Sequence, residues 1–246
     1  MKKRVLVVSD NVALCNAFQK LISVYHETEV DYAYSYTNKN FLSSNGLEVK
    51  AQSICIKEEV DSLVGRYDLI LSLHCKQLFP AALVKAVKCI NVHPGFNPFN
   101  RGWFPQVFSI LNGMPFGATI HEIDELLDHG GIIAQKMVRG EIWETSIDIY
   151  NKIVEAEIML LEEFLPAILN NTYTIVSPTV EGNVNLKKDF NALCHLDLSE
   201  AVTMGQAIHR LRALTHGDYK NAWFEHPETG EKIYVSINLE KEKEQK

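Results

Sequence analysis

The feature that most limits how this chain folds is a regular alternation of short apolar runs with segments of helical spacing. Arg4–Ser9 is a mostly apolar run that leads into Ser-Asp-Asn, which is typical of a buried parallel strand followed by a helix start. From Val12 to Val24, apolar side chains recur at helical intervals. Because strands that alternate with helices pair in parallel, the sequence predicts an α/β fold with a doubly wound, mostly parallel sheet.

The same criteria predict the remaining elements of this layered fold. Further strands are expected at Val30–Tyr36, Val49–Ile56, Leu69–Leu73, Cys89–Val92 and Ala118–Glu122, and helices around Glu58–Val64 and Pro80–Val87 fall between several of them. Pro105 near its start and Gly113 after its end bracket one more helix. The alternation therefore continues through the first half of the chain.

A long amphipathic helix is expected from Thr145 to about Leu165. Thr145 suits the N-cap, with Asp148 in the N3 position. Pro166 should end or kink this helix, because proline lacks the backbone N–H that the helix needs. We expect the helix to cover one face of the sheet.

The pattern changes after Pro178, which separates a first domain at residues 1–177 from a C-terminal region at residues 178–239. A small helix is expected at about Thr203–Leu214, followed by a β-hairpin. Its strands would be Ala222–Glu225 and Lys232–Leu239, with one apolar face formed by Ile233, Val235, Ile237 and Leu239. Because a lone hairpin is marginally stable, this face should pack on something, and a partner subunit is expected. The charged tail, residues 240–246, should be frayed and solvated.

Composition sets the class of protein. A chain of 246 residues with 46% apolar content can bury a proper core, as one large domain or as a domain with a small appendage. The net charge is −7 and the charged residues make up 22%. Because nucleic-acid backbones are bound by clustered Lys and Arg, this balance argues against a general nucleic-acid partner.

The chain shows no targeting signal that would place it at a membrane. The start Met1-Lys2-Lys3-Arg4 is basic, but the apolar run that follows, Val5–Val8, is too short for a signal peptide. No run approaches the length of a membrane-spanning helix. The five cysteines are spread widely, with no CxxC, and are expected to be buried reduced thiols. These features favour a cytoplasmic protein without a membrane partner.

A candidate site lies where one predicted strand ends. Asn91 and His93 occupy the end of the strand at Cys89–Val92, and Asp128 precedes the glycine pair Gly130-Gly131. Ligands of parallel sheets bind at the carboxyl ends of strands. When an amine attacks a carbonyl group, amide and imidazolium N–H groups can stabilise the oxyanion, while a carboxylate orients the imidazole and accepts the proton. The set therefore favours acyl transfer to an amine, without a covalent intermediate on the protein.

Other chemistries lack their sequence signatures. The turn after the first strand carries no GxGxxG, and no Walker sequence is present, which disfavours nicotinamide enzymes and P-loop phosphotransferases. His93, His121 and Asp128 match no common zinc spacing, so no metal is expected. Cys75 and Cys89 have no supporting triad spacing for a nucleophile.

These motifs together resemble a known family. The run INVHPGFNPFNRGW and the later GATIHEIDELLDHGGIIAQ are similar to the formyltransferases that use N10-formyltetrahydrofolate. Their hallmarks are an N-x-H tripeptide at a strand end, a G-A/V-T-x-H strand and a D-x-G-x-I loop. All three occur here in order, within a resemblance that covers about residues 1–170. The resemblance implies a Rossmann-like α/β fold, N10-formyltetrahydrofolate as cosubstrate, and a catalytic domain at residues 1–177.

Departures within the family indicate the acceptor. The glycinamide ribonucleotide and methionyl-tRNA enzymes usually read S-L-L-P after the His-Pro pair, whereas this chain reads Gly95-Phe96-Asn97-Pro98. This loop, together with Asn100-Arg101-Gly102-Trp103, is similar to bacterial sugar N-formyltransferases that act on dTDP-4-amino-4,6-dideoxyglucose. The resemblance implies a role in surface polysaccharide synthesis, such as the O-antigen of lipopolysaccharide. The short C-terminal hairpin resembles the dimerising region of such enzymes, which implies a homodimer.

The resemblance also implies residue roles. Asn91, His93 and Asp128 would be catalytic. Cofactor binding, largely through backbone groups, would fall to Lys76, Gln77 and Leu78 and to Asp124, Glu125, Leu126 and Leu127. Substrate binding would involve Gly95, Arg101 and Trp103.

Purely structural roles stay open for several of these residues, and two other functions stay open for the chain. The two loops can be ordinary connections, Arg101 a solvated loop residue, and Trp103 a cap on the core. His209, Arg210 and Arg212 are expected on a solvated helix face. Glycinamide ribonucleotide or methionyl-tRNA is the alternative acceptor, although the missing barrel domain and the acidic balance disfavour tRNA. A non-catalytic folate- or nucleotide-binding module is the alternative of another class.

Overall fold

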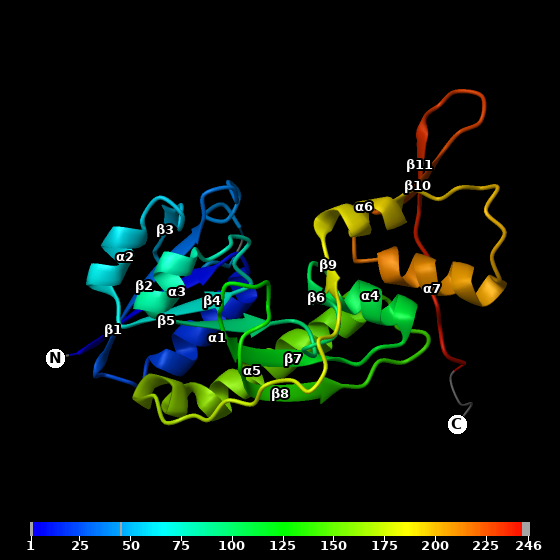
Figure 1. Cartoon of the computed structure of the whole chain (residues 1–246). Helices are drawn as coiled ribbons and strands as arrows, with labels where there is room; N and C mark the ends of the chain where they lie inside the picture. Colours follow the sequence, from blue (N-terminus) through cyan, green and yellow to red (C-terminus); the bar gives the residue numbers. More distant parts are fainter. Residues whose placement is uncertain (1, 45, 243–246) are drawn as a thin grey trace.

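The computed structural model, which describes residues 2–44 and 46–242, is built around a seven-stranded sheet (Figure 1). In spatial order the strands are β3 (Ala51–Ile54), β2 (Thr28–Ser35), β1 (Lys3–Ser9), β4 (Leu69–Leu73), β5 (Lys88–His93), β7 (Phe116–Glu122) and β8 (Ile132–Val138). β1 to β5 run parallel, β7 is antiparallel to β5, and β8 is antiparallel to β7. The predicted doubly wound, mostly parallel sheet is confirmed.

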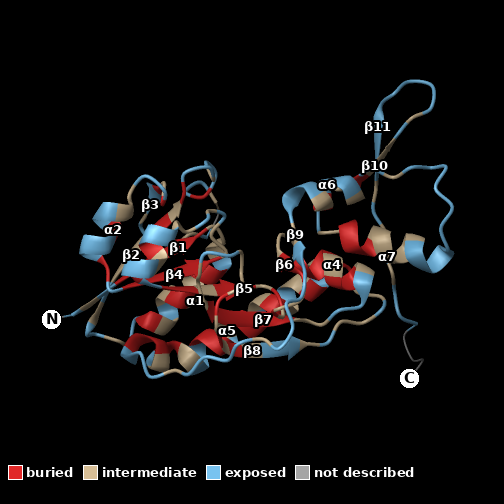
Figure 2. Cartoon of the chain, viewed as in Figure 1, coloured by how far each residue is buried: buried red, intermediate tan, exposed pale blue. Residues whose placement is uncertain are grey.

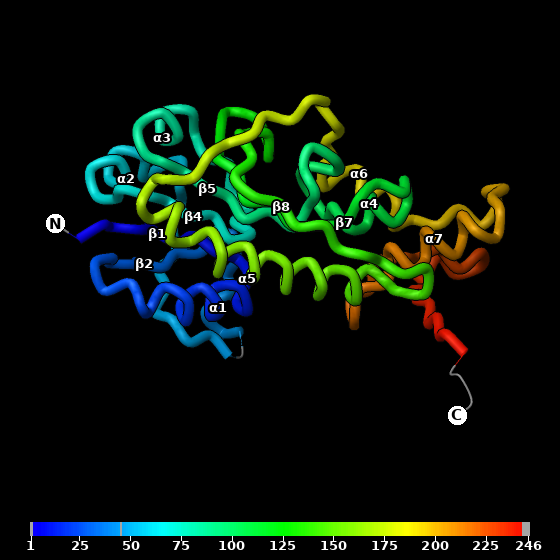
Figure 3. The backbone as a smooth tube through the Cα atoms, turned by 90° about the horizontal axis from the view of Figure 1, so that it is seen from below, coloured from blue at the N-terminus to red at the C-terminus, as the bar shows by residue number. Residues whose placement is uncertain are grey.

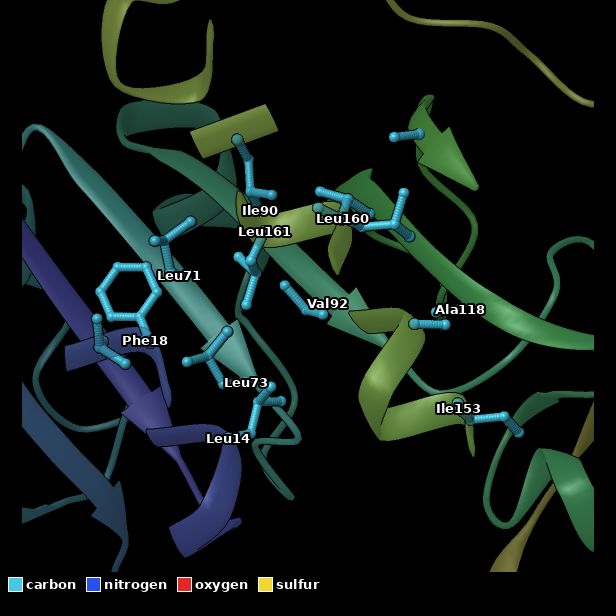
Figure 4. Close-up of a cluster of buried hydrophobic side chains, with 14 of the residues drawn as sticks. Leu14, Phe18, Leu71, Leu73, Ile90, Val92, Ala118, Ile153, Leu160 and Leu161 are labelled. Carbon is cyan, nitrogen blue, oxygen red and sulfur yellow. The ribbon is translucent and has the colours of Figure 1, made fainter. Parts of the chain in front are cut away.

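Helices cover both faces of this sheet, and β1 shows how the sequence arranges it. Val5 and Val7 point into the core shared with α1 (Val12–Ile22) and α5 (Ser146–Asn170), whereas Leu6 and Val8 point to the opposite face. That second face is covered by α2 (Val60–Arg66) and α3 (Ala81–Ala86). Each large side chain buried in this way stabilises the fold by about 1.5–3 kcal/mol. Figures 2 and 4 show the buried sheet and the side chains packed on one face.

The helix α5 begins as predicted but does not end as predicted. The Asp148 carboxylate accepts a hydrogen bond from the Thr145 N–H at 2.8 Å, which completes the expected capping interaction. The helix then continues through Pro166 to Asn170, so the expectation that Pro166 ends it was wrong. Pro166 and Glu162 both lie on the exposed side, where water can bond the Glu162 carbonyl that the proline leaves free.

The strand β8 was not predicted, and several boundaries differ from expectation. β8 follows the Gly130-Gly131 pair at the edge of the sheet, with Ile132 and Ala134 buried on alternate positions. This period of two is the signal that would have found it. β3 is shorter than the expected Val49–Ile56, because only the residues opposite β2 pair with it.

The C-terminal region lies at one end of the sheet, beyond α4 (Pro105–Asn112) (Figures 1 and 3). A short parallel pair joins it to the first part of the chain: β6 (Arg101–Gly102) with β9 (Val184–Asn185). Then come α6 (Lys187–Cys194), which was not predicted, and α7 (Met204–Leu214). The predicted hairpin is confirmed as β10 (Ala222–Glu225) and β11 (Lys232–Val235), and it projects from the body of the molecule.

Two expectations about this region need correction, and a third falls mostly outside the described residues. β11 ends at Val235 rather than Leu239, because no partner strand continues beside it. Arg212 is buried rather than solvated, because its guanidinium donates to the Glu141 and Glu144 carbonyls and joins α7 to the loop before α5. Residues 240–242 have no regular secondary structure, and the rest of the tail expected to be frayed lies outside the described residues.

In the part of the chain that the structure describes, no helix is long and apolar enough to cross a bilayer.

Candidate active site

The three residues expected to be catalytic converge at the end of β5. The strand register aligns Asn91 with His121 and His93 with Thr119 on β7. Asp128 lies in the loop that leaves β7, and its Oδ1 accepts a hydrogen bond from Asn91 Nδ2 at 3.0 Å. Its Oδ2 lies 3.5 Å from His93 Nδ1. An amide, an imidazole and a carboxylate therefore share one small space at the carboxyl edge of the parallel strands.

The backbone around Asp128 is held in a strained shape. Asp128 has a φ of 47°, a left-handed conformation that costs a non-glycine residue free energy and is frequent at functional sites. The Gly102 N–H donates to Asp128 Oδ2 at 3.0 Å, and Asn97 Nδ2 donates to the Asp128 carbonyl at 2.8 Å. A side chain at Gly130 would collide with the Glu122 carbonyl, which explains the glycine there. These contacts fix the direction in which the carboxylate points.

His93 is buried and neutral in this environment. Burial lowers the pKa of His93 to about 4, although the charge of Asp128 opposes the shift. With its proton on Nδ1, which faces Asp128, the ring leaves a lone pair on Nε2. Nε2 is buried and has no hydrogen-bond partner in the described structure. That nitrogen therefore keeps a lone pair that no described residue uses.

Gly95 lies against the same nitrogen. A Cβ atom placed on Gly95 would be 2.5 Å from His93 Nε2, closer than any real contact of this kind. The missing side chain is what lets the imidazole occupy its position. The substrate role expected for Gly95 remains a prediction, while its direct neighbour in this structure is His93.

Asp128 is held as a carboxylate. Burial favours the neutral acid, but the neighbouring His93 and His121 side chains and the Gly102 N–H outweigh it and lower the pKa of Asp128. His121 Nδ1 lies 2.7 Å from the Glu122 carbonyl, so this nitrogen carries the proton and His121 Nε2 accepts from Asn91 at 3.2 Å. The two N–H groups of Asn91 thus bond Asp128 and His121 and hold both side chains in place.

A cavity of about 430 Å³ opens beside Asp128. It is bounded by Asn97, Pro98, Arg101, Asp124, Asp128, His129, Gly130, Gly131 and the segment Ser177–Glu181. Arg101 is buried, and one of its terminal nitrogens lies 2.7 Å from the exposed carboxylate of Glu181. The alternative that Arg101 is a solvated loop residue was therefore wrong. Arg101 lines a cavity next to the Asp128 carboxylate.

The segment Lys76–Leu78 follows β4 on the same edge of the sheet. Lys76 donates its backbone N–H to Asp10 at 2.8 Å. The Gln77 side chain donates to the Ile54 carbonyl and accepts from the Ile56 N–H, both at 3.0 Å. Leu78 is 74% exposed. The backbone of this segment is thus pinned while an apolar side chain faces solvent.

The loop Asp124–Leu127 lies between β7 and β8. Asp124 lines the cavity, accepts from the Leu126 N–H at 2.8 Å, and lies 2.7 Å from His129 Nδ1. Glu125 pairs with Lys85, and Leu126 is 59% exposed. The cofactor role expected for these residues stays a prediction, as does that of Lys76–Leu78.

Trp103 lies beside the site rather than in it. Its ring is 5.6 Å from that of Phe104, and the Lys187 ammonium lies 5.3 Å above it. The backbone N–H of Trp103 donates to Asn185, which ties β6 to the C-terminal region. Trp103 is half-buried at this junction, so base stacking and core capping both remain open to it.

The cysteines and possible metal ligands of the described residues form neither a reactive thiol nor a metal cluster. Burial raises the pKa of both Cys75 and Cys89 to about 12, so neither forms much thiolate at neutral pH. Cys55 and Cys75 are half-buried rather than fully buried, and all five cysteines are unpaired. Within residues 2–44 and 46–242, no three His, Cys, Asp or Glu side chains are grouped as metal ligands are.

Several residues that shape the site were missing from the predicted set. Thr119 donates to the Gly95 carbonyl at 2.6 Å, and Gln135 donates to Asn97 and Thr119 at 2.7 and 3.0 Å. His121 orients Asn91. Thr119 and His121 stand in the G-A-T-I-H motif and face the site on alternate positions of β7, which is the signal that would have identified them. No local pattern marks Gln135.

Comparison with known proteins identifies the family of this chain. Residues 8–165 match the formyl transferase family, and residues 189–241 match the N-formyltransferase dimerization C-terminal domain. The chain is 55% identical, over 188 residues, to a dTDP-4-amino-4,6-dideoxyglucose formyltransferase of Mycobacterium tuberculosis, covering 76% of this chain and 80% of the relative.

Solved structures extend the similarity over the whole fold. A 4-N formyltransferase from Francisella tularensis is 44% identical with a TM-score of 0.92, covering 97% of this chain and 98% of that one. A sugar N-formyltransferase from a Shewanella species is 42% identical with a TM-score of 0.93, covering 98% and 99%. Such coverage extends from the central sheet into the C-terminal region. The chain therefore belongs to the formyl transferase family.

Proposed function

We propose that this protein transfers the formyl group of N10-formyltetrahydrofolate to the amino group of dTDP-4-amino-4,6-dideoxyglucose. The observation that carries the proposal is the convergence of Asn91, His93 and Asp128 beside a cavity lined by a buried arginine. The name of the 55% identical relative supports the nucleotide sugar, and the 4-N formyltransferase of Francisella supports the amine at position 4. The product belongs to surface polysaccharide synthesis, such as that of the O-antigen.

The proposed mechanism needs no covalent intermediate on the protein. The free amine attacks the formyl carbon, and the carbonyl oxygen becomes an oxyanion while the nitrogen becomes positively charged. His93 Nε2 takes the proton from that nitrogen, and Asp128 stabilises the imidazolium that forms. Once protonated, the Nε2–H group of His93 stabilises the oxyanion, while the two N–H groups of Asn91 hold Asp128 and His121 in place. The bond from carbon to N10 then breaks, and the proton passes to N10, which leaves tetrahydrofolate and the formamide.

Each substrate has a proposed binding segment. The backbone of Lys76–Leu78 and of Asp124–Leu127 holds the pterin, because both segments are pinned on the edge where His93 and Asp128 lie. The guanidinium of Arg101 binds the diphosphate of the nucleotide sugar, since its planar fork matches phosphate oxygens. Gly95 and Trp103 flank the sugar and the base.

We also propose an organisation for the whole protein. Residues 1–177 form the catalytic domain, residues 178–239 form the dimerisation region, and residues 240–246 form a charged tail. Ile233 and Tyr234 on β11 are 37% and 48% exposed, and such apolar surface fits a contact with a second copy. The match to a dimerization domain supports the homodimer. The protein acts in the cytoplasm.

Incubation with N10-formyltetrahydrofolate and a panel of acceptors tests the function. We expect a mass gain of one formyl group on dTDP-4-amino-4,6-dideoxyglucose and faster turnover than with UDP-linked aminosugars. Formylation of glycinamide ribonucleotide or methionyl-tRNA instead would overturn the acceptor. Binding of folate and dTDP-sugar with no formylated product would identify a non-catalytic binding module.

A further inference from the structure

A half-buried histidine, His74, follows β4 at the same edge of the sheet as His93, and the proposed mechanism does not use it. β4 pairs in parallel with β5 so that Leu73 lies opposite Val92. His74 and His93 follow these two positions and therefore leave adjacent strands side by side. A positive charge on His74 would lower the pKa of His93.

His74 is held in a conformation that it would not adopt freely. Its φ is 59°, in the left-handed region, which a non-glycine residue adopts at a cost in free energy and keeps only where its surroundings fix it. Three side chains from two helices hold the ring. Glu157 Oε1 of α5 lies 2.7 Å from His74 Nε2, while Asn11 Nδ2 and the Tyr150 hydroxyl lie 3.2 and 3.3 Å from His74 Nδ1.

The hydrogen bonds determine which nitrogen of His74 carries a proton. Asn11 is the N-cap of α1, and its Oδ1 accepts from the Leu14 N–H at 3.0 Å. The amide nitrogen of Asn11 therefore faces His74, and it can only donate. His74 Nδ1 must accept this bond, so the single ring proton lies on Nε2 and is donated to Glu157. The ring is neutral in this arrangement.

The buried carboxyl group of Glu157 lowers the stability of the fold. Its side chain is completely buried in α5, and its Oε2 has no hydrogen-bond partner in the described structure. Burial raises the pKa of Glu157, partly offset by His74. A buried carboxyl of this kind costs stability relative to an apolar side chain of similar size. Its position is therefore better explained by what it does for His74 than by what it adds to the core.

Among the titratable groups near His74, only Glu157 both bonds a ring nitrogen and can set the charge of the ring. Those that face the ring are Glu157 and Tyr150 of α5 and His93 of β5. Burial raises the pKa of Tyr150, so its hydroxyl stays neutral. The charge on His74 then depends on the clamp formed by Asn11 on one nitrogen and Glu157 on the other.

We propose that Asn11 and Glu157 are positioning residues that hold His74 as a neutral, Nε2-protonated imidazole beside His93. The proposal rests on the proposed role of His93 as the group that takes up the amine proton. A cationic His74 next to it would oppose that protonation by electrostatic repulsion and would repel an incoming ammonium group. Asn11 and Glu157 thus hold His74 in place as a neutral ring.

Two substitutions separate the charge of His74 from the stability of the fold. Asn11→Asp keeps a good N-cap for α1 but presents a carboxylate to His74 Nδ1, so the ring should become doubly protonated. Glu157→Gln keeps an oxygen that accepts from Nε2. We expect kcat to fall about tenfold or more in Asn11→Asp, with an unchanged melting temperature and a KM for the formyl donor within about threefold of wild type. Glu157→Gln should retain at least about a third of the wild-type kcat.

NMR measures the protonation of His74 without relying on enzyme activity. In ¹⁵N-histidine-labelled protein at pH 7, His74 should show one protonated nitrogen in wild type and Glu157→Gln and two in Asn11→Asp. A doubly protonated His74 in wild type, or wild-type kcat in Asn11→Asp with the second proton present, would overturn the proposal. Glu157→Met distinguishes a structural role: a lowered melting temperature with unchanged kcat would also overturn it. If wild type formylates no dTDP-sugar, the proposed function fails, while the NMR result still decides the state of the clamp.

Discussion

The Asn91 amide donates to Asp128 Oδ1 at 3.0 Å across 37 positions of sequence. This bond joins the end of a parallel strand to a strained loop, and His93 lies 3.5 Å from the other oxygen of the same carboxylate. The contact makes the three residues one unit, so changes at one of them should be felt at the others. Five predictions follow from this unit and its surroundings.

Asp128→Asn should lower kcat about a hundredfold or more while the protein stays folded, because the variant keeps the shape of the side chain but cannot stabilise a protonated His93. Steady-state formylation of the aminosugar measures the loss, and circular dichroism checks the fold. Asp31→Asn is the matched control, since it removes a half-exposed carboxylate from β2 far along the sheet. Near-normal turnover in Asp128→Asn would contradict the mechanism.

His93 should remain neutral at pH 7 and titrate near pH 4, as its pKa of about 4 requires. The charge of Asp128 raises the pKa of His93 against burial, so removing that charge in Asp128→Asn should lower the pKa further. Histidine-selective NMR titration of the unliganded protein measures both values. A His93 that is protonated at pH 6.5 would show that the burial argument is wrong.

Protein stability should also depend on His93. Its folded pKa of about 4 lies below the ordinary 6.5, so on acidification the unfolded chain takes up a proton first. The stability contributed by a neutral His93 is present above about pH 6.5 and is lost as pH falls toward 4. Urea unfolding between these values should show a shallower decline in His93→Gln than in wild type. Parallel curves would mean that His93 does not contribute.

Gly95→Ala should lower kcat by one to two orders of magnitude, because its methyl group would displace His93, and a shift of about 1 Å at a catalytic group can cost about a hundredfold. Gly65→Ala is the matched control. A Cβ on Gly65 meets nothing within 4 Å, and alanine favours the helix α2 in which it lies. Equal kcat in the two variants would remove Gly95 from the explanation of the site.

Arg101→Gln should raise the KM for the nucleotide sugar about tenfold, the equivalent of one lost charged hydrogen bond of about 1.4 kcal/mol. Glu181→Gln removes the same ion pair but keeps the guanidinium, so the KM should not rise. Melting temperatures of both variants separate binding from folding. A similar rise in both variants would mean that the ion pair, and not the arginine charge, matters.

Much of the central fold could be predicted because its information is local. The apolar run of β1 and the alternation of strands with helices indicated the parallel sheet, and the Thr145–Asp148 cap lies within one turn of helix. The edge strand β8 and the continuation of α5 through Pro166 could not be predicted, because each depends on its neighbours in the folded structure. Solvent beside Glu162 tolerates the proline, and β7 supplies the partner that pairs with β8.

The same distinction holds for the site. Residue types and their order in the sequence were sufficient to select Asn91, His93 and Asp128 and to indicate acyl transfer, because strand ends of a parallel sheet meet at one edge. Only the tertiary structure decided that His93 is desolvated, that Gly95 makes room for it, and that Arg101 is buried at a cavity. Burial, hydrogen-bond geometry and charge state are properties of neighbours brought together from distant positions, so they arise only when the chain is folded.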